Sequence, residues 1–206
     1  MIQGIAVFGL NGGGKSTLSH SLAGQIGYYE MDVEDYYFPA QRKSRRAALE
    51  ADCLTEGEPF DKLPFSEPKS KEEVQSALLE DIKIHQNFIL SGVTMDWKDE
   101  ILSRIELAFW IQTPLEERLK RIQAREEKRF GKRVLPGGDM FLQQMKFRKQ
   151  VEQREPGLVE QSAQKLRCPV IILDGTLEIA KNVAAMLEAL KERGELCQKP
   201  EYQELS

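Results

Sequence analysis

Residues 6–22 read AVFGLNGGGKSTLSHSL and contain four glycines within six positions. Gly9, Gly14, Lys15 and Ser16 match the pattern G-x-x-x-x-G-K-[ST] in full. The match follows an apolar run and opens a predicted helix. Glycines allow successive backbone N–H groups to curl around an anion, and the partial positive charge of a helix N-terminus favours phosphate. The stretch therefore predicts a phosphate-binding loop between a strand and a helix.

The loop positions have expected tasks in phosphoryl transfer. The Lys15 ammonium reaches the β and γ phosphates of a nucleoside triphosphate, and the Ser16 hydroxyl binds Mg²⁺. Thr17 either contacts the α phosphate or is a polar position on the helix surface. The alternative is a glycine-rich turn that only packs tightly, but the motif and its context both favour phosphate. We expect ATP and Mg²⁺ to bind the loop residues Gly9, Asn11, Gly12, Gly13, Gly14, Lys15, Ser16 and Thr17.

Short apolar runs alternate with amphipathic or polar stretches along the chain. This alternation is typical of βα units, whose parallel strands are covered by helices on both faces. The sequence predicts an α/β fold with three α/β/α layers and a five-stranded, mostly parallel sheet. The predicted strands are residues 5–8, 28–31, 88–90, 107–111 and 170–173.

The clearest helix pattern covers residues 114–129. Thr113 is expected to cap this helix, Pro114 to take its first position, and Glu116 to complete a capping box. Apolar residues occupy one face of the pattern, and a row of arginines occupies another. These arginines are Arg118, Arg121 and Arg125.

Length and charge restrict the function classes. A chain of 206 residues favours one domain. The net charge is −4, with 29 basic and 33 acidic residues, so the chain has no excess positive charge to hold a nucleic-acid backbone. We therefore expect small-molecule partners and no bulk binding of nucleic acid.

The chain lacks the marks of an exported, membrane-spanning or zinc-binding protein. Cys53, Cys168 and Cys197 are odd in number and far apart, which argues against a disulfide framework. The N-terminus has no basic region before its apolar residues, and no 18 apolar residues run together. His20 and His85 form no zinc pattern with the cysteines. We expect a cytoplasmic protein without a membrane partner.

The order of these motifs over about residues 1 to 190 resembles the small P-loop kinases. That group includes the adenylate kinase-like, uridine and nicotinamide riboside kinase-like and shikimate kinase-like enzymes. The resemblance implies transfer of a phosphoryl group from ATP with Mg²⁺, and it leaves the acceptor open because fold does not determine substrate.

The stretch MDVEDYYFP, residues 31–39, resembles a segment that uridine and nicotinamide riboside kinases place beside the transferring phosphate. The match aligns Glu34 and Asp35 with the two acidic residues of that segment. A carboxylate there orients the acceptor hydroxyl and helps to hold Mg²⁺, so Asp32, Glu34 and Asp35 are all candidates. We expect catalytic roles for Glu34 and Asp35 and metal binding by Ser16, Asp32 and Asp35. A polar loop at a strand end is the simpler alternative.

The stretch FWIQTPLEERLKRIQAREEKRFGKR, residues 109–133, resembles the strand, helix and lid of this kinase group. On that match Arg118 is the helix arginine, Arg125 and Arg129 belong to the lid, and Arg133 stands behind them. Cations that close over ATP stabilise the charge of the transition state. A solvated basic helix face would have the same composition.

The stretch VIILDGTLEIAKNV, residues 170–183, resembles the last strand and turn of nucleotide kinases. The resemblance implies that Asp174, Gly175 and Thr176 line the pocket for the nucleotide base. An ordinary strand-to-helix turn explains these residues about equally well.

One position departs from the nucleotide-kinase pattern, because Ser91 stands where the third strand usually ends in Asp. The Ser91 hydroxyl or Asp96 would then serve the metal ion through water. This departure disfavours a nucleoside monophosphate as the acceptor. A nucleoside or another small hydroxyl compound is the alternative, held between the Asp35 region, the basic cluster at residues 42–46 and the loop at residues 93–97. The basic cluster is either a site for an acidic acceptor or a solvated helix face.

We expect one kinase-like domain over residues 1–192, followed by a polar tail over residues 193–206. Residues 39–86 form an acceptor-side helical excursion, and residues 125–139 form a short lid. The function predicted is transfer of phosphate from ATP to a small hydroxyl or phosphate acceptor. The alternatives are an ATP-binding regulatory protein with little transfer activity, and a nucleic-acid end kinase, which the charge balance disfavours.

Overall fold

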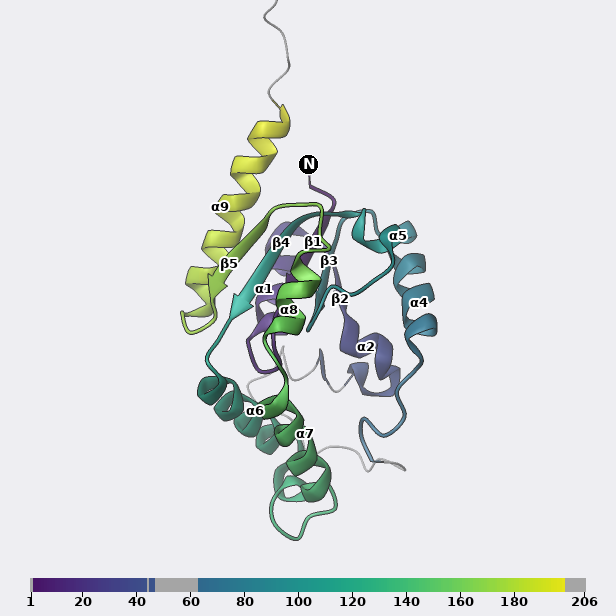
Figure 1. Cartoon of the computed structure of the whole chain (residues 1–206), viewed down its shortest axis with the longest axis vertical. Coiled ribbons are helices and arrows are strands. Elements are labelled where there is room, and N and C mark those ends of the chain that lie inside the picture. Colours follow the sequence, from purple (N-terminus) through teal and green to yellow (C-terminus); the bar gives the residue numbers. More distant parts are fainter. Residues whose placement is uncertain (1, 44, 47–62, 199–206) are drawn as a thin grey trace, which may run out of the picture.

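The computed structural model describes residues 2–43, 45–46 and 63–198. Its centre is one sheet in the order β2-β3-β1-β4-β5, in which every neighbouring pair of strands is parallel (Figure 1). All five predicted strands are confirmed. Their bounds are β1 Gly4–Phe8, β2 Tyr29–Asp32, β3 Phe88–Gly92, β4 Ile105–Gln112 and β5 Val170–Asp174.

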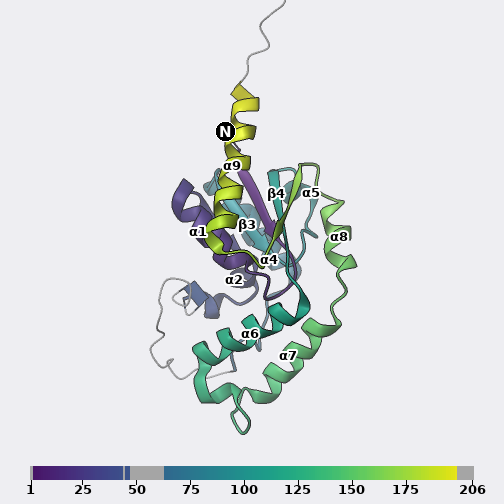
Figure 2. The ribbon, with the colours of Figure 1, turned by 90° about the vertical axis from the view of Figure 1, so that its left-hand side faces the viewer.

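Two helices cover one face of the sheet, α1 (Lys15–Ile26) and α9 (Ile179–Gln198) (Figure 2). Ile5 and Val7 of β1 point to this face because alternate residues of a strand share a side. They pack against apolar side chains of both helices, among them Leu22 of α1, which is fully buried. Each such side chain contributes about 1.5–3 kcal/mol of hydrophobic stabilisation.

The other face packs against α4 (Lys71–Ile84), α5 (Asp99–Leu102) and α8 (Gly157–Ala163). Ala6 and Phe8 of β1 point to this side. The sheet is therefore buried on both faces, and the predicted three-layer α/β/α class is confirmed.

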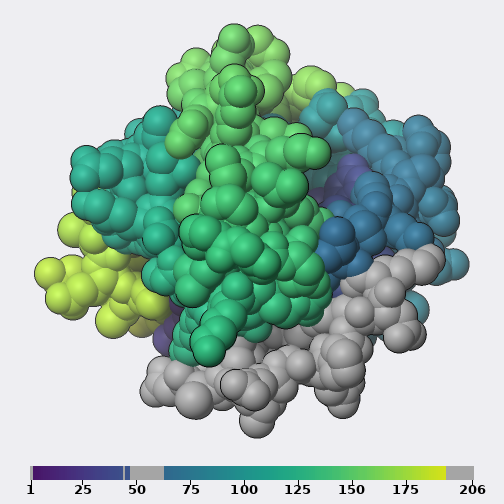
Figure 3. Space-filling model, turned by 90° about the horizontal axis from the view of Figure 1, so that it is seen from below, coloured from purple at the N-terminus to yellow at the C-terminus, as the bar shows by residue number. Residues whose placement is uncertain are grey.

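The remaining helices lie beyond the carboxyl ends of the strands, at the lower edge of Figure 1. Parallel α/β sheets bind ligands at this edge. Figure 3 views it directly and shows a hollow between the green and blue segments, with purple N-terminal residues at its floor. These elements are α2 Val33–Tyr37, η1 Pro39–Gln41, α6 Leu115–Phe130, η2 Gly131–Val134 and α7 Phe141–Gln153.

The helix expected at residues 114–129 is present as α6, but its predicted cap is wrong. Pro114 is the N-cap residue, and no side chain caps the helix. The Thr113 hydroxyl instead donates to the carbonyl oxygen of Gly13 at 3.3 Å. The reason is tertiary: the phosphate loop lies beside the start of α6 and offers Thr113 a carbonyl acceptor.

The predicted tail begins inside a helix, because α9 continues to Gln198. The predicted acceptor-side excursion over residues 39–86 includes residues 44 and 47–62, which lie outside the described residues, as does Cys53. In the part of the chain that the structure describes, no helix is both long and apolar enough to span a bilayer.

Candidate active site

The loop between β1 and α1 has a backbone that requires glycine. Gly9, Gly12 and Gly14 have φ values of 144°, 80° and 96°. A Cβ atom on Gly9 would lie 2.4 Å from the carbonyl oxygen of Ile111, and one on Gly12 would lie 2.5 Å from that of Arg118. The loop is thus pressed against the end of β4 and the start of α6, where side chains at these positions would clash.

The first amides of α1 are free to bind an anion. Within the described residues, the backbone N–H groups of Gly14, Lys15 and Ser16 have no carbonyl acceptor, whereas the N–H of Leu18 donates to Gly14. Unpaired amides at a helix N-terminus point outward along the helix axis. Together with the helix dipole, they make a site for the phosphates of a nucleotide.

The Lys15 side chain reaches back to the start of this loop. Its Nζ donates to the carbonyl oxygen of Leu10 at 3.1 Å. Burial lowers the pKa of Lys15 to about 8, although the nearby charges of Asp32 and Glu34 oppose the shift. A bound phosphate would supply the negative charge that this buried ammonium lacks.

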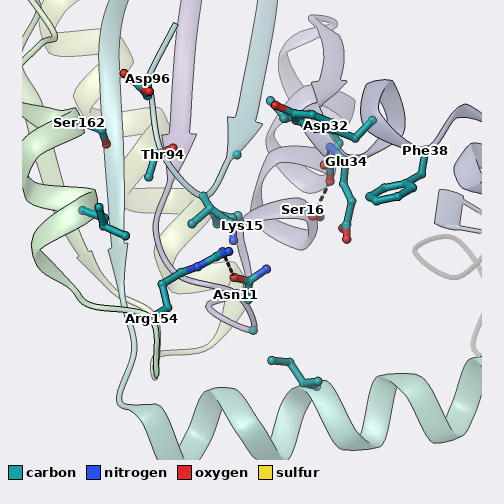
Figure 4. Close-up of a pocket in the computed structure, with 18 of the residues that line it drawn as sticks. Asn11, Lys15, Ser16, Asp32, Glu34, Phe38, Thr94, Asp96, Arg154 and Ser162 are labelled. Carbon is teal, nitrogen blue, oxygen red and sulfur yellow. Dashed lines mark hydrogen bonds between the residues drawn. The ribbon is translucent and has the colours of Figure 1, made fainter. Parts of the chain in front are cut away.

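Ser16 and Asp32 form the part of the site that suits a metal ion. The Ser16 hydroxyl donates to Oδ2 of Asp32 at 2.6 Å (Figure 4). The other oxygen, Oδ1, accepts from the backbone N–H of Glu34 at 3.0 Å and caps α2, so the Asp32 side chain is held in place. Burial raises the pKa of Asp32 despite the nearby Arg45. A hydroxyl and a carboxylate are oxygen donors that fit Mg²⁺.

This donor set is small. The structure, over the residues it describes, contains no group of three or more His, Cys, Asp or Glu side chains able to hold a metal ion. Mg²⁺ at phosphoryl-transfer sites needs only one or two protein ligands, because phosphate oxygens and water complete its shell. Ser16 and Asp32 therefore fit a metal ion that arrives with the nucleotide.

Glu34 and Asp35 have different positions because successive residues of a helix are about 100° apart around its axis. Glu34 lines the main cavity. Asp35 points away from it, and its carboxylate accepts from Arg45 Nε at 2.8 Å and Arg46 Nε at 3.3 Å. The structure thus brings Asp32 and Glu34 together with Ser16, but not Asp35, which we had expected to share both tasks.

Arg45 connects the three carboxylates at the end of β2. Its side chain is only 10% exposed and contacts Glu34, Asp35 and, at 2.8 Å, Oδ2 of Asp32. Burial alone would raise the pKa of Glu34, but Arg45 and Arg125 outweigh it and hold that pKa below its usual value. Arg45 lies in the predicted basic cluster and faces the acidic groups rather than solvent.

Arg118 supports the loop from behind. Its Nε donates to the carbonyl oxygen of Thr113 at 3.1 Å, and its NH1 to that of Asn11 at 3.3 Å. The residue is buried, and burial lowers its pKa. Arg118 does not line the cavity, contrary to the expected contact with ATP. Because the first turn of α6 packs against the loop, the Arg118 side chain points to backbone carbonyl groups there and not into the cavity.

Three arginines one helical turn apart line the cavity from α6: Arg121, Arg125 and Arg129. Arg125 NH2 lies 2.6 Å from Oε1 of the buried Glu126. Arg129 is 5% exposed and stacks over the Phe65 and Phe130 rings at 5.4 and 4.9 Å. Burial lowers the pKa of Arg129, and its NH2 has no acceptor in the described chain. That nitrogen remains able to bind an anion.

The predicted lid, residues 125–139, ends in a turn that is held together by a side-chain ion pair. Arg133 donates to both oxygens of Asp139, from Nε at 3.0 Å and from NH2 at 2.7 Å. A Cβ atom on Gly138 would lie 2.2 Å from the carbonyl oxygen of Arg133. Arg133 thus holds the turn, and Arg125 and Arg129 face the cavity.

Gly175 and Thr176 line a second cavity, of about 500 Å³, which adjoins the first. Gly14, Thr17 and Arg121 line both cavities. A Cβ atom on Gly175 would lie 1.9 Å from the Thr113 hydroxyl oxygen and 3.0 Å from the Gly13 carbonyl oxygen, so this turn packs directly on the loop. Gly175 and Thr176, two of the predicted base-pocket residues, thus line a cavity beside the phosphate loop.

The main cavity has a volume of about 890 Å³. In Figure 4, Lys15 lies near its centre, with Asp32, Glu34 and Phe38 on one side and Thr94, Asp96 and Ser162 on the other. Ser91 is buried and lies outside the lining; its hydroxyl has no partner among the described residues. Asp96 lines the cavity but is engaged by two lysines, Lys71 and Lys165.

Sequence reasoning missed several cavity residues. Arg121 NH1 donates to the carbonyl oxygen of Gly175 at 2.9 Å. Because Arg121 belongs to the arginine row of α6, the sequence could have identified it as a cavity residue. Arg154 NH1 donates to Asn11 Oδ1 at 2.6 Å, across 143 residues of chain. No local pattern marks Arg154, Lys71 or Lys165, because they reach the cavity from segments that only the fold brings together.

Comparison with known proteins agrees with this architecture. The family model described as AAA domain matches residues 5–137. A relative from Bacillus subtilis (strain 168), the uncharacterized protein YqaC, is 26% identical over 198 residues, covering 92% of this chain and 98% of the relative.

Two solved structures share the fold. A shikimate kinase from Bacteroides thetaiotaomicron superposes with a TM-score of 0.54 at 18% identity, covering 92% of this chain and 98% of that one. A gluconokinase from Sinorhizobium meliloti 1021 gives 0.51 at 14% identity, covering 96% and 98%. The predicted resemblance to P-loop small-molecule kinases is confirmed at the level of fold.

Proposed function

Since the chain belongs to the AAA domain family and has the fold of P-loop small-molecule kinases, we propose that it transfers the γ-phosphoryl group of ATP to the hydroxyl of a small acceptor. The fold is one that binds nucleotides and supports phosphoryl transfer. The observation that carries the proposal is the contact between Ser16 and Asp32 at 2.6 Å, beside a free helix N-terminus and with Glu34 in the same cavity.

The loop binds the donor. The unpaired amides at the start of α1 and the Lys15 ammonium receive the β and γ phosphates. Ser16 and Asp32 hold Mg²⁺, which when bound neutralises phosphate charge and orients the γ-phosphoryl group. Gly175 and Thr176 receive the base in the adjoining cavity.

Glu34 orients the acceptor. Its carboxylate accepts a hydrogen bond from the acceptor hydroxyl and takes the proton as the new bond between that oxygen and the γ phosphorus forms. The bond between the γ phosphorus and the bridging oxygen breaks, and ADP leaves. The lowered pKa of Glu34 keeps it ionised and ready to accept a hydrogen bond.

The arginines of α6 stabilise the transferring group. Arg121, Arg125 and Arg129 present cations to the cavity from one helix face. Negative charge spreads over the equatorial oxygens during transfer, so fixed cations lower the barrier. We propose that residues 125–139 act as a short lid of a single domain spanning residues 1–192, in the cytoplasm.

A second candidate is an ATP-binding regulatory protein with little transfer activity. The observation that favours it is Arg45, which already engages Asp32, Glu34 and Asp35. If Arg45 stays there when nucleotide binds, neither the metal ion nor the acceptor reaches these carboxylates.

Calorimetry with ATP and Mg²⁺, followed by a screen for ADP release, separates the two candidates. The screen covers nucleosides, nucleoside monophosphates and small hydroxy acids. We expect ATP to bind and at least one acceptor class to stimulate ADP release. Binding without any stimulated release would contradict the kinase proposal and favour the regulatory one.

A further inference from the structure

The main cavity is strongly basic although the whole chain carries a net charge of −4. Its lining includes eight Lys or Arg side chains and three Asp or Glu side chains. A nucleoside triphosphate accounts for the cations that surround the loop and line α6. Arg45 is matched by the carboxylates at the end of β2. The charges that remain lie on the opposite wall.

This wall, which we call the lysine wall, consists of Lys71, Asp96, Trp97 and Lys165. Lys71 comes from the first turn of α4, Lys165 follows α8, and Asp96 and Trp97 lie between β3 and α5. In Figure 4, Asp96 lies on the side of Lys15 away from Glu34 and Phe38. A ligand that reaches Glu34 with a hydroxyl can therefore place its other end at the lysine wall.

The lysine wall offers hydrogen-bond donors in excess. Lys71 Nζ lies 2.9 Å from Oδ2 of Asp96, and Lys165 Nζ contacts Oδ1. Both oxygens of the carboxylate are thus engaged by ammonium groups, each of which has three donors. The buried indole N–H of Trp97 has no acceptor in the described chain. Two cations share one anion, so the wall keeps a positive charge and unused donors.

The three charged side chains of the wall are also accessible. The side chains of Lys71, Asp96 and Lys165 are 45%, 51% and 53% exposed. A neutral polyol needs hydrogen-bond acceptors for its hydroxyl protons, and the carboxylate of this wall is occupied. An anionic group has only acceptors and carries the opposite charge.

We infer that the acceptor carries a carboxylate or phosphate group bound by Lys71 and Lys165, at the end of the cavity opposite Glu34; this inference rests on the proposed kinase function. Arg154 is assigned to the donor side, because it contacts Asn11 of the loop. The acceptor therefore spans the cavity, with its hydroxyl at Glu34 and its anionic group at the lysine wall.

The first experiment measures anion binding without turnover. Inorganic phosphate and malonate are titrated calorimetrically into the wild-type chain, with and without Mg²⁺ and a non-hydrolysable ATP analogue. We expect Lys71→Gln and Lys165→Gln each to weaken binding of at least one probe about fivefold, since each removes one cation from the site. Lys83→Gln, which removes an exposed lysine from the far end of α4, serves as the charge-matched control and leaves binding unchanged.

Asp96→Asn gives a change of the opposite sign. It removes the carboxylate that the two lysines share, so the probe that binds the lysine wall should bind about threefold more tightly. A residue that only supports the fold would not tighten binding when substituted. Equal affinities in Lys165→Gln and Lys83→Gln, or weaker binding in Asp96→Asn, would overturn the inference.

The second experiment compares acceptors that share one carbon skeleton. ADP release is measured with a polyol, its aldonic acid and its phosphate monoester, and with nucleosides and their 5′-monophosphates. We expect kcat/KM for the carboxylate or the phosphate form to exceed that of the neutral form at least about tenfold. Equal or better use of the neutral forms would overturn the inference. Anion binding at the lysine wall without any ADP release would overturn the proposed function instead.

Discussion

The donor side and the acceptor side of this cavity are built in opposite ways. The part of the donor side that holds phosphate is one continuous stretch, residues 9–17, whose glycines and helix N-terminus define its shape. The acceptor side combines α2, the loop after β3, the first turn of α4 and the end of α8. The phosphate loop depends on residues that are neighbours in the sequence, whereas the acceptor side depends on contacts between distant segments. This difference explains why the sequence predicts phosphate binding but does not identify the acceptor.

The largest effect is expected on the acceptor side. Glu34→Gln should lower kcat by about 10²–10⁴, because the hydroxyl loses the group that takes its proton. ATP affinity, measured by calorimetry, should stay within about twofold of wild type, since no donor-side contact changes.

Asp35→Asn is the matched variant next along the chain. It removes a buried carboxylate that pairs with Arg45 and Arg46, so its main effect should be a lower melting temperature. Its loss of kcat should be smaller than that of Glu34→Gln. If Asp35→Asn reduced kcat as strongly as Glu34→Gln at equal folded fraction, Asp35 would share the role that we propose for Glu34 alone.

A smaller loss is expected on the donor side. Lys15→Ala should weaken ATP binding about 100-fold, the size of one charge-assisted contact of roughly 3 kcal/mol. Circular dichroism should show an unchanged fold, because burial of this ammonium opposes rather than supports folding. Lys120→Ala, on the exposed face of α6, is the control. Unchanged affinity in Lys15→Ala would show that the loop does not bind the triphosphate.

The pH dependence of ATP binding tests the same lysine without a substitution. The folded pKa of Lys15 is about 8, below its ordinary value, so the free protein loses this charge as pH rises through 8. Phosphate binds the charged form, and affinity should therefore fall about tenfold between pH 7 and pH 9. Calorimetry at the two pH values measures the change. Lys15→Ala should lack this dependence; an equal fall in both proteins would assign it to another group.

The smallest effect concerns the boundary between the two sides. Arg45 donates to the same Asp32 oxygen that accepts from Ser16. Arg45→Gln should increase the affinity for Mn²⁺ in the absence of nucleotide about fivefold, because one competing cation is gone. Electron paramagnetic resonance measures free Mn²⁺ directly. Arg46→Gln, which pairs with Asp35 instead, is the control, and equal Mn²⁺ affinities in the two variants would contradict the competition.

The helix and strand pattern was predictable because burial imposes a regular period on the sequence. All five strands and α6 appear where the alternation predicts them. The cap of α6 was wrong because Thr113 found an acceptor in the loop, and Arg118 was placed inward because the same loop packs on the first turn of α6. Local spacing does not contain these contacts between distant segments.

The sequence by itself determined the parallel α/β fold and the phosphate loop, because both depend on neighbouring residues: apolar period, glycine content and the helix that follows. Only the tertiary structure decided that Glu34 and not Asp35 faces the cavity, and that Lys71 and Lys165 meet at Asp96. The physical reason is that a side chain's direction and charge partners depend on how helices from separate segments pack at the end of the sheet.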